Sequence, residues 1–408
     1  MSRRSFEALT YRDFRRYIGM RCFFTLAGQM QVTILGFYVY QFTHSKMAIA
    51  LVGLFGAIPA IGGALYGGHI ADRAEKRKLL LISCGGAGLL SLALLAVMGG
   101  GLSGRWILPV IYAVICCNGI VRVFYEPAAH IVYAQSIPKA LYPKASSWDN
   151  ASWQVASIAG PAIAGFLYGF AGIAVALGAV ALCMMTAWGF VFRLRKYPAV
   201  YAGKEPLGKS VAAGLRFIFG NKVMVYAMSL DLFCVLFGGV IALLPVYALD
   251  ILHVGTEGLG IMRMAFSLGA TLTMLAMVHY SPMGKPWRNL LLAVTGFGIS
   301  IIAFGLSHNF LLSLALLFLQ GAFDSVSVLI RSTLMQMLTP DEMRGRVSAV
   351  NSLFISSSSE LGDLESGVAA GLLGTAPAVV FGGAMTLLIT GFVSMRPLPS
   401  TMPAPDER

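Results

Sequence analysis

We single out ten acidic or basic residues that lie inside long apolar stretches of this 408-residue sequence, away from the polar segments that hold most of its charges. Placing a charged side chain at the centre of a membrane costs about 2.5–3.5 kcal/mol on insertion scales, so such a residue is expected to face a partner charge or a wet cavity. These residues are therefore candidates for binding a polar substrate or for carrying protons. The ten residues are Arg21, Arg122, Glu126, Asp231, Arg263, Asp324, Arg331, Glu360, Asp363 and Glu365.

Asp324 is the strongest candidate for a proton-carrying group. It follows Gln320 and Gly321 deep in an apolar stretch, and a shift of 202 positions along the chain places it on Arg122. A carboxylate binds its proton more tightly in an apolar site and less tightly beside an arginine, so a switch between two such sites would couple proton binding to movement. A static Arg122–Asp324 pair that only holds two halves of the protein together is the alternative.

Three acidic residues within six positions form a second candidate cluster. Glu360 and Asp363 are three residues apart and share one face of the expected helix, whereas Glu365 points well away from them. Packing alone does not explain three acids there, but water, coupling protons or a cationic substrate would. Asp231 is also expected to face a cavity, because its short side chain lies too deep in an apolar stretch to reach the membrane edge.

Arg21 and Gln29 lie on the first apolar stretch and extend the candidate cavity lining. Glu126 directly precedes Pro127, so it lies either in the cavity or at the membrane edge. Arg331 stands near a basic end of its stretch, and we expect its long side chain to extend toward that edge. The sequence thus predicts a polar lining that both halves of the chain contribute to.

The composition indicates which elements must hold these residues. Hydrophobic residues make up 57% of the sequence and charged residues 12%, about half of the roughly 25% charged residues in a soluble domain. This excess excludes a soluble enzyme, a disordered chain and, despite the net charge of +12, a nucleic-acid-binding protein. A membrane-spanning helix needs about 20 apolar residues. The chain length therefore accommodates twelve spans, and we expect an all-α, polytopic membrane protein.

The apolar stretches predict where these twelve spans lie. They run over 17–42, 47–71, 79–100, 106–133, 148–170, 173–192, 223–249, 258–280, 289–307, 310–333, 347–373 and 376–395. This pattern predicts two six-helix halves at 1–192 and 223–395, with a cytoplasmic linker at 193–222 and a cytoplasmic tail at 396–408. The 202-residue shift also superimposes Gly119 on Gly321 and Gly160 on Gly362, as expected for two pseudo-symmetric halves.

The basic residues predict the orientation. Of the 30 Lys and Arg residues, 24 fall in the N-terminal segment, the linker, the tail and alternate connections, whereas only Lys46 and Arg105 fall on the other side. The positive-inside rule then places both termini in the cytoplasm. The six cysteines lie in apolar stretches without metal-ligand spacing, so we expect no disulfide framework, no metal site and no cofactor.

The segment 68–78, which reads GHIADRAEKRK, resembles the cytoplasmic signature of the major facilitator superfamily. The resemblance implies that Gly68 allows close helix packing and that Asp72 helps to latch the two halves together. It also implies that Arg73, Lys76 and Arg77 engage an acidic partner or lipid headgroups. A glutamate replaces the second glycine of the signature at position 75, and an ordinary basic loop is the alternative interpretation.

Two further resemblances concern transport. Gly160, Pro161 and Gly165 resemble the Gly-Pro kink in the fifth span of superfamily antiporters, although a packing kink is the alternative. The segments 122–128 and 331–367 resemble the bacterial exporter branch that includes siderophore and drug effluxers. This second resemblance concerns the branch and does not identify the substrate.

The resemblance implies a secondary active exporter and not an enzyme. We expect it to move a siderophore-like or drug-like organic molecule out of the cell by proton antiport, acting as a monomer in the inner membrane. Its expected partners are that substrate, protons and membrane lipids, without nucleic acid. The alternatives are a lysophospholipid or metal-ion transporter of the same superfamily and a membrane-embedded transferase. The sequence has no phosphate-binding P-loop, which excludes a self-contained ATP-driven pump.

Overall fold

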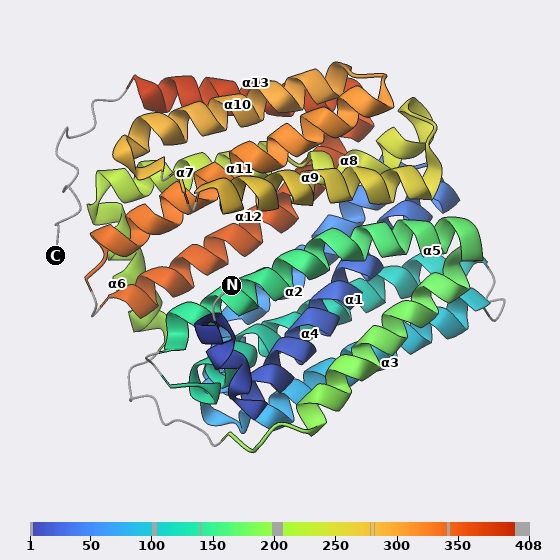
Figure 1. The fold of residues 1–408 in the computed structure, drawn as a ribbon. Coiled ribbons are helices and arrows are strands. Elements are labelled where there is room, and N and C mark those ends of the chain that lie inside the picture. The colour runs from blue at the N-terminus through green and yellow to red at the C-terminus, as the bar shows by residue number, and fades with distance from the viewer. Residues whose placement is uncertain are drawn as a thin grey trace.

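The structure is a computed structural model that describes residues 3–99, 104–138, 141–197, 207–277, 279–280, 282–340 and 343–395. Within these ranges the chain is almost entirely helical and contains no strand. The helices form two bundles, one of N-terminal helices in blue to green and one of C-terminal helices in yellow to red (Figure 1). The expected all-α class is confirmed.

The first bundle contains a short 3-10 helix and five α-helices. Their bounds are η1 (Arg3–Thr10), α1 (Arg12–Thr43), α2 (Lys46–Arg73), α3 (Lys76–Gly99), α4 (Gly104–Ser136) and α5 (Tyr142–Phe192). Helix α5 is two spans joined at Gly172, whose φ of 80° lies in the region that favours glycine. The five helices therefore supply six crossings.

The second bundle follows the linker helix α6 (Leu207–Gly220). Its elements are α7 (Lys222–Phe237), α8 (Val240–Val246), the π-helical turn η3 (Tyr247–Ile251), α9 (Gly255–Met277), η4 (Pro282–Gly284), α10 (Pro286–Leu306), α11 (Phe310–Leu338), α12 (Arg344–Leu373) and α13 (Thr375–Ser394). The elements α7, α8 and η3 form a single crossing that is interrupted at Gly238 and Gly239. This bundle also has six crossings.

Nine helical segments in the described ranges are long and apolar enough to cross a membrane. Three of the twelve predicted crossings are therefore not counted separately, each for a physical reason. Helix α5 counts once but crosses twice, α2 is described as apolar only over Lys46–Pro59, and α12 carries several charges. The twelve-span fold predicted from hydropathy is confirmed, with helix ends that extend a few residues beyond the apolar stretches.

Polar side chains fix where several crossings begin. Ser45 accepts a hydrogen bond from the Ala48 amide at the start of α2, and Asn309 accepts one from the Leu312 amide at the start of α11. Asn221 accepts hydrogen bonds from two amides at the start of α7. Such caps satisfy amides that have no partner within the helix. Each cap therefore marks the point where a connection ends and a crossing starts.

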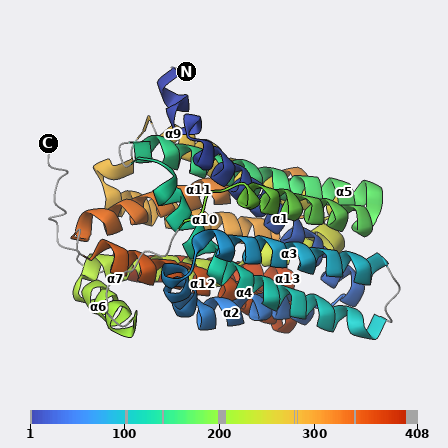
Figure 2. The ribbon, with the colours of Figure 1, turned by 90° about the horizontal axis from the view of Figure 1, so that it is seen from below.

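The start of α1, the end of α13 and α6 lie at one end of the molecule, which we call the linker end (Figures 1 and 2). The other end is called the opposite end. Helix α1 runs from the linker end to the opposite end and α2 returns, so the first residues of α2 and the last residues of α12 are neighbours at the opposite end. The tail predicted at 396–408 lies outside the described residues.

Described residues of the two bundles contact each other near the middle of the molecule and toward the opposite end. A hydrophobic cluster joins Phe37 and Ile49 of the first bundle to Leu244 and Ala370 of the second. The Tyr40 hydroxyl at the end of α1 donates a hydrogen bond to the Asp250 carboxylate of η3. The main contacts between the bundles are those of α2 with α12 and of α5 with α9.

Candidate functional site

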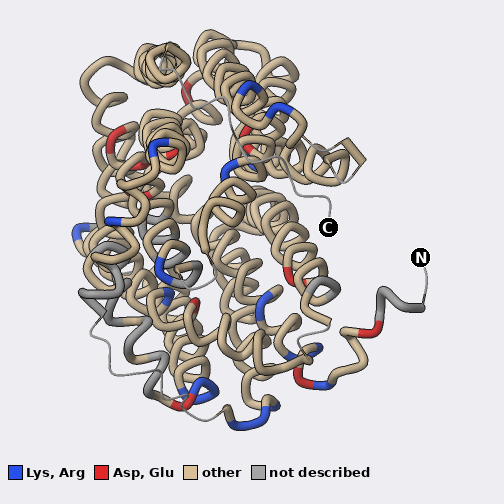
Figure 3. Tube along the Cα trace, turned by 90° about the vertical axis from the view of Figure 1, so that its left-hand side faces the viewer, with Lys and Arg blue, Asp and Glu red and all other residues tan. Residues whose placement is uncertain are grey.

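The charged residues of the inner helices fall into groups within each bundle and between the bundles. Figure 3 looks onto the linker end and shows basic positions on both bundles. Three groups lie deeper: a cluster in the first bundle, a pair in the second, and a row of charges between the two. Each group brings together residues that are distant in the sequence.

The cluster in the first bundle is centred on Arg21 of α1. Its Nε lies 2.8 Å from Asp149 Oδ1 on α5, and its Nη1 lies 3.7 Å from Glu126 Oε2 on α4. The Tyr17 hydroxyl donates a hydrogen bond of 3.1 Å to the same Asp149 oxygen. The side chains of Arg21 and Asp149 are only 13% and 16% exposed, whereas Glu126 is 49% exposed. Glu126 thus remains available from one side.

Asp149 was not singled out from the sequence, because it lies in the polar run 146–150 at the very start of the apolar stretch 148–170. Its helix begins at Tyr142, so Asp149 stands two turns inside α5. Asp149 could have been found by asking which carboxylate lies at the same depth in the membrane as Arg21 of α1, which needs a partner of opposite charge.

In the second bundle, Asp231 of α7 and Arg331 of α11 form a buried ion pair. The side chains are 14% and 12% exposed, and the Arg331 Nε also donates a hydrogen bond of 3.3 Å to the Ser327 carbonyl. Arg331 therefore turns inward to Asp231 instead of extending toward the membrane edge. In the first bundle the arginine is on α1 and an acid on α4, whereas here the acid is on α7 and the arginine on α11.

The charges between the bundles begin with Arg122 of α4. Its Nη1 lies 3.9 Å from Glu360 Oε1 on α12, and its side chain is 64% exposed. The ion pair of Arg122 is therefore with Glu360 and not with Asp324. The sequence repeat equates positions at similar depth on α4 and α11, but α4 packs on α2, which contacts α12, whereas α11 packs on α9 and α10.

Asp363 lies one turn beyond Glu360 on α12 and interacts electrostatically with Arg263 of α9. The Arg263 Nε is buried and donates no hydrogen bond within the described part of the chain. Asp363 also packs on α2, because its Cβ lies 2.8 Å from where a Cβ would stand on Gly53. Three helices therefore meet at this acid and bring both bundles to it.

Asp324 has a different environment from the paired acids. It lies deep inside the protein yet keeps part of its side-chain surface accessible, and it has no ion pair with any described residue. Gln320, one turn earlier on α11, has a buried Oε1 that likewise lacks a hydrogen bond in the described ranges. An accessible carboxylate and an unsatisfied amide oxygen on one helix face indicate a polar space beside α11.

Glu365 points away from Glu360 and Asp363, as the helical spacing predicts. Its Oε2 accepts a hydrogen bond of 3.4 Å from the neighbouring Ser366 hydroxyl. Ser366 in turn lies against Gly239, where the crossing formed by α7 and α8 is interrupted. Glu365 thus lies near the break in that crossing.

The glycines of α5 allow close helix packing. A Cβ on Gly160 would lie 2.7 Å from Gln29 Cβ on α1, so Gln29 lies at the contact between α1 and α5. A Cβ on Gly165 would lie 2.6 Å from the Thr256 carbonyl oxygen of α9. The non-helical backbone of α5 is at Gly172 and not near Pro161. The sequence Gly160-Pro161…Gly165 thus provides close approach, and the chain direction changes eleven residues after the proline.

The basic signature contacts the first bundle where its side chains are described. Lys76 is fully buried and its Nζ donates a hydrogen bond of 3.0 Å to the Ala74 carbonyl. The Arg77 Nη2 donates one of 2.5 Å to the Phe192 carbonyl, and its guanidinium lies 5.6 Å from the Phe192 ring centroid. The side chains of Gly68, Asp72 and Arg73 lie outside the described part of the structure.

These groups can bind a polar molecule or protons through acids and bases that face one another across the bundles. In the part of the chain that the structure describes, no three His, Cys, Asp or Glu residues gather closely enough to hold a metal ion. A helical membrane bundle with two similar halves and charges between them is the architecture of a membrane transporter.

The chain belongs to the Major Facilitator Superfamily, whose family model matches residues 17–362. It is 24% identical over 319 residues to the enterobactin exporter EntS of Shigella flexneri, covering 76% of this chain and 74% of the exporter. It is 25% identical over the same length to the enterobactin exporter EntS of Escherichia coli O139:H28, with the same coverage. The superfamily expected from the basic signature is confirmed, and the chain is a transporter and not an enzyme.

Solved structures show the same fold at low identity. The nucleoside transporter NupG superposes with a TM-score of 0.73 at 13% identity, over 94% of this chain and 98% of NupG. A D-xylose-proton symporter superposes with a TM-score of 0.73 at 14% identity, over 95% of this chain and 98% of the symporter. The chain is therefore a multi-pass membrane transporter that binds a small-molecule substrate.

Proposed function

We propose that this transporter exports a small organic molecule, siderophore-like or drug-like, by proton antiport with alternating access. The halves 1–192 and 223–395 rock against each other, with both termini in the cytoplasm of a cell whose inner membrane holds the protein as a monomer. The relatives named as enterobactin exporters support export and a siderophore-like cargo. In this proposal the linker at 193–222 connects the halves on the cytoplasmic side.

The observation that carries the proposal is the position of the charges relative to the contact between the bundles. The contacts of Gly53 with Asp363 and of Ala50 with Gly367 lie toward the opposite end, and Arg122 and Glu360 face each other at the inner edge of this contact. Asp324 lies in the middle of α11 without an ion pair among the described residues. A substrate that enters from the linker end would meet these groups before the closed opposite end.

Asp324 is the proposed proton carrier because a proton can be exchanged only by a group whose charge is not fixed by a permanent partner. Asp231 and Asp149 each have an arginine in contact, which favours their ionised form in every state that keeps the pair. Glu360 of the second bundle pairs with Arg122 of the first, so this pairing changes when the bundles move. Asp363 packs against Gly53 of the first bundle, so its surroundings change as well. We assign these two acids to substrate binding and to the closing contact.

Transport by inside-out vesicles tests the proposal. Vesicles with an acidic lumen are expected to take up a catecholate siderophore or a cationic dye, and an uncoupler is expected to abolish uptake. Asp324→Asn is expected to lower gradient-driven uptake at least tenfold, because the amide cannot release a proton. The measurement is initial uptake per amount of reconstituted protein.

Glu75→Gln is the matched control, since Glu75 lies on the connection between α2 and α3 and pairs with Lys78 at 3.5 Å. It removes one carboxylate outside the bundle interior and is expected to transport normally. Uptake that persists at the wild-type rate in Asp324→Asn would remove Asp324 from the mechanism. Uptake that is insensitive to the pH gradient in the wild type would exclude proton antiport.

A further inference from the structure

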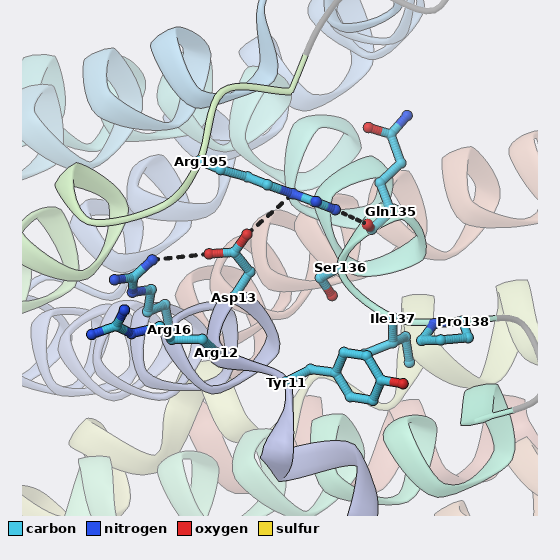
Figure 4. Close-up of a pocket in the computed structure, with 9 residues that line it drawn as sticks. All are labelled: Tyr11, Arg12, Asp13, Arg16, Gln135, Ser136, Ile137, Pro138 and Arg195. Atoms are coloured by element: carbon cyan, nitrogen blue, oxygen red, sulfur yellow. Dashed lines mark hydrogen bonds and ion pairs between the residues drawn. The ribbon is translucent and has the colours of Figure 1, made fainter.

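A polar pocket of about 610 Å³ lies at the linker end of the first bundle, apart from the charges between the bundles (Figure 4). Three elements form it: the start of α1, the end of α4 and the chain that follows α5. Its lining residues are Tyr11, Arg12, Asp13, Arg16, Gln135, Ser136, Ile137, Pro138 and Arg195. The transport mechanism proposed above does not use this pocket.

The pocket carries three arginines and one carboxylate. Asp13 Oδ1 lies 3.0 Å from Arg16 Nη1, and Asp13 Oδ2 lies 3.1 Å from Arg195 Nε. The Arg195 Nη2 also donates a hydrogen bond of 2.8 Å to the Gln135 carbonyl at the end of α4. Figure 4 shows Arg16 and Arg195 converging on Asp13 from opposite sides. Two arginines thus share the single acid, so the pocket has an excess of positive charge.

The carboxylate of Asp13 is satisfied from a third direction as well. The Tyr197 hydroxyl donates a hydrogen bond of 3.4 Å to Asp13 Oδ2. Burial raises the pKa of Tyr197, so its hydroxyl stays protonated and remains a donor. Asp13 therefore cannot also neutralise Arg12. Arg12 is exposed and has no ion pair with any residue that the structure describes.

The apolar helices place the pocket at the expected edge of the membrane. The apolar crossing of α1 begins there and that of α4 ends there, and the lining includes the exposed ring of Tyr11 beside Ile137 and Pro138 (Figure 4). Aromatic rings of this kind are enriched where the hydrocarbon meets the headgroups. A basic pocket between crossings at this depth matches the chemistry of a phospholipid headgroup. Guanidinium groups bind phosphate oxygens in pairs, and three of them line this pocket.

We propose that this pocket binds the phosphate headgroup of an anionic phospholipid, with Arg12 as the main ligand and Arg16 and Arg195 held in place by Asp13. A phospholipid fits better than free phosphate, because the pocket lies where the apolar crossing of α1 begins and that of α4 ends, at the depth where lipid headgroups are expected. The bound lipid would link the start of α1 to the chain after α5. This site does not depend on which substrate the transporter carries.

Lipid titration of the purified full-length protein tests the proposal. In detergent, dioleoyl-phosphatidylglycerol is expected to raise the apparent unfolding temperature saturably, whereas dioleoyl-phosphatidylcholine is not. Arg12→Gln is expected to weaken half-saturation by phosphatidylglycerol about fivefold, the effect of one basic residue at an anionic lipid surface. Native mass spectrometry of the same samples counts the retained lipid.

Arg15→Gln is the matched control. Arg15 is exposed on the same turn of α1 and does not line the pocket, so this change removes the same charge at the same membrane edge. It is expected to leave half-saturation within twofold of wild type. Equal weakening by both variants would mean that general surface charge attracts the lipid, which overturns the site.

Two further outcomes also overturn the proposal. Equal stabilisation by phosphatidylcholine would show that the anionic headgroup is not recognised. Stabilisation by millimolar inorganic phosphate that matches phosphatidylglycerol and is lost in Arg12→Gln would show an anion site that takes free phosphate. Because Arg12 is exposed, Arg12→Gln is expected to fold, and its unfolding temperature without lipid checks this directly.

Discussion

At the scale of single residues, the inner charges are kept in the membrane by partners of opposite sign. Arg21 has Asp149, and Arg331 has Asp231. Removing one member of a buried pair leaves the other without compensation, which is more costly than removing both. The paired and the unpaired acids are therefore expected to respond differently to substitution.

The pair in the second bundle gives a direct prediction. Asp231→Asn is expected to destabilise the protein by about 3–5 kcal/mol, because it leaves the Arg331 guanidinium buried and unpaired. The double variant Asp231→Asn with Arg331→Gln is expected to recover more than half of this loss. Apparent unfolding temperatures in detergent, arranged as a double-mutant cycle, measure the coupling.

The comparison with Asp324→Asn separates the two roles. That variant is expected to unfold within a few degrees of wild type while losing gradient-driven uptake, since Asp324 has no ion pair among the described residues. Two results would show that the ion pair has no part in stability. Asp231→Asn alone could be as stable as the double variant with Arg331→Gln, or the double variant could be the least stable protein of the cycle.

The sequence predicted which residues carry the chemistry better than it predicted their partners. A charge in an apolar stretch is visible without a structure, and most of the inner charges were found in this way. Asp149 was missed because a polar run hides the start of α5, and the Arg122–Glu360 pair was missed because contacts between halves are not encoded in a repeat. Pairing depends on how two bundles meet, and no local pattern records it.

At the scale of elements, small residues decide how closely the bundles approach. Helices α5 and α9 meet through Gly165 and Gly260, where a Cβ on the first would lie 3.0 Å from the Cα of the second. Helices α2 and α12 meet through Gly367, where a Cβ would lie 2.5 Å from Ala50 Cβ. Such small-residue contacts replace hydrophobic burial as the source of helix association in lipid.

Gly165→Val is expected to push the two bundles apart at the opposite end. Its side chain would meet the Thr256 backbone, and overpacking of this kind costs about 1–3 kcal/mol. Nitroxide labels at Met47 and His308, which lie at that end of the two bundles, are expected to report a longer mean distance by electron paramagnetic resonance. The native cysteines are replaced beforehand.

Gly178→Val is the control on the same helix. A Cβ at Gly178 would have no heavy atom within 4 Å, so the label distance is expected to stay unchanged. If Gly165→Val also left the distance unchanged, the α5–α9 contact would not hold the bundles together, and the Gly-Pro sequence would have only a local role.

The crossings themselves were largely predictable, because their hydropathy is set by the membrane and not by tertiary contacts. The break at Gly172 agrees with the predicted boundary between the stretches 148–170 and 173–192, whereas the interruption at Gly238 and Gly239 was not predicted. Two adjacent glycines occur in many continuous membrane helices. Only the packing of Gly239 against Ser366 distinguishes this position, and it depends on α12.

At the scale of the whole molecule, several contacts between described residues of the two bundles gather toward the opposite end. Tyr40 with Asp250, Gly53 with Asp363 and Gly165 with Gly260 all lie toward the opposite end. Rocking of two halves about a central site requires contacts at one end that break while others form. In the proposed mechanism the Tyr40–Asp250 hydrogen bond is one that must break in each transport cycle.

Tyr40→Phe is therefore expected to shift the conformational equilibrium toward opening at the opposite end. A hydrogen bond to a carboxylate contributes about 1.5–3 kcal/mol, so its loss changes the population ratio about tenfold or more. The labels at Met47 and His308 are expected to show an enlarged long-distance population. Tyr38→Phe, whose hydroxyl has no hydrogen bond in the described ranges, is the control and is expected to match wild type. An unchanged distance distribution in Tyr40→Phe would mean that apolar packing alone closes this end, since the cluster of Phe37, Ile49 and Leu244 remains intact in the variant.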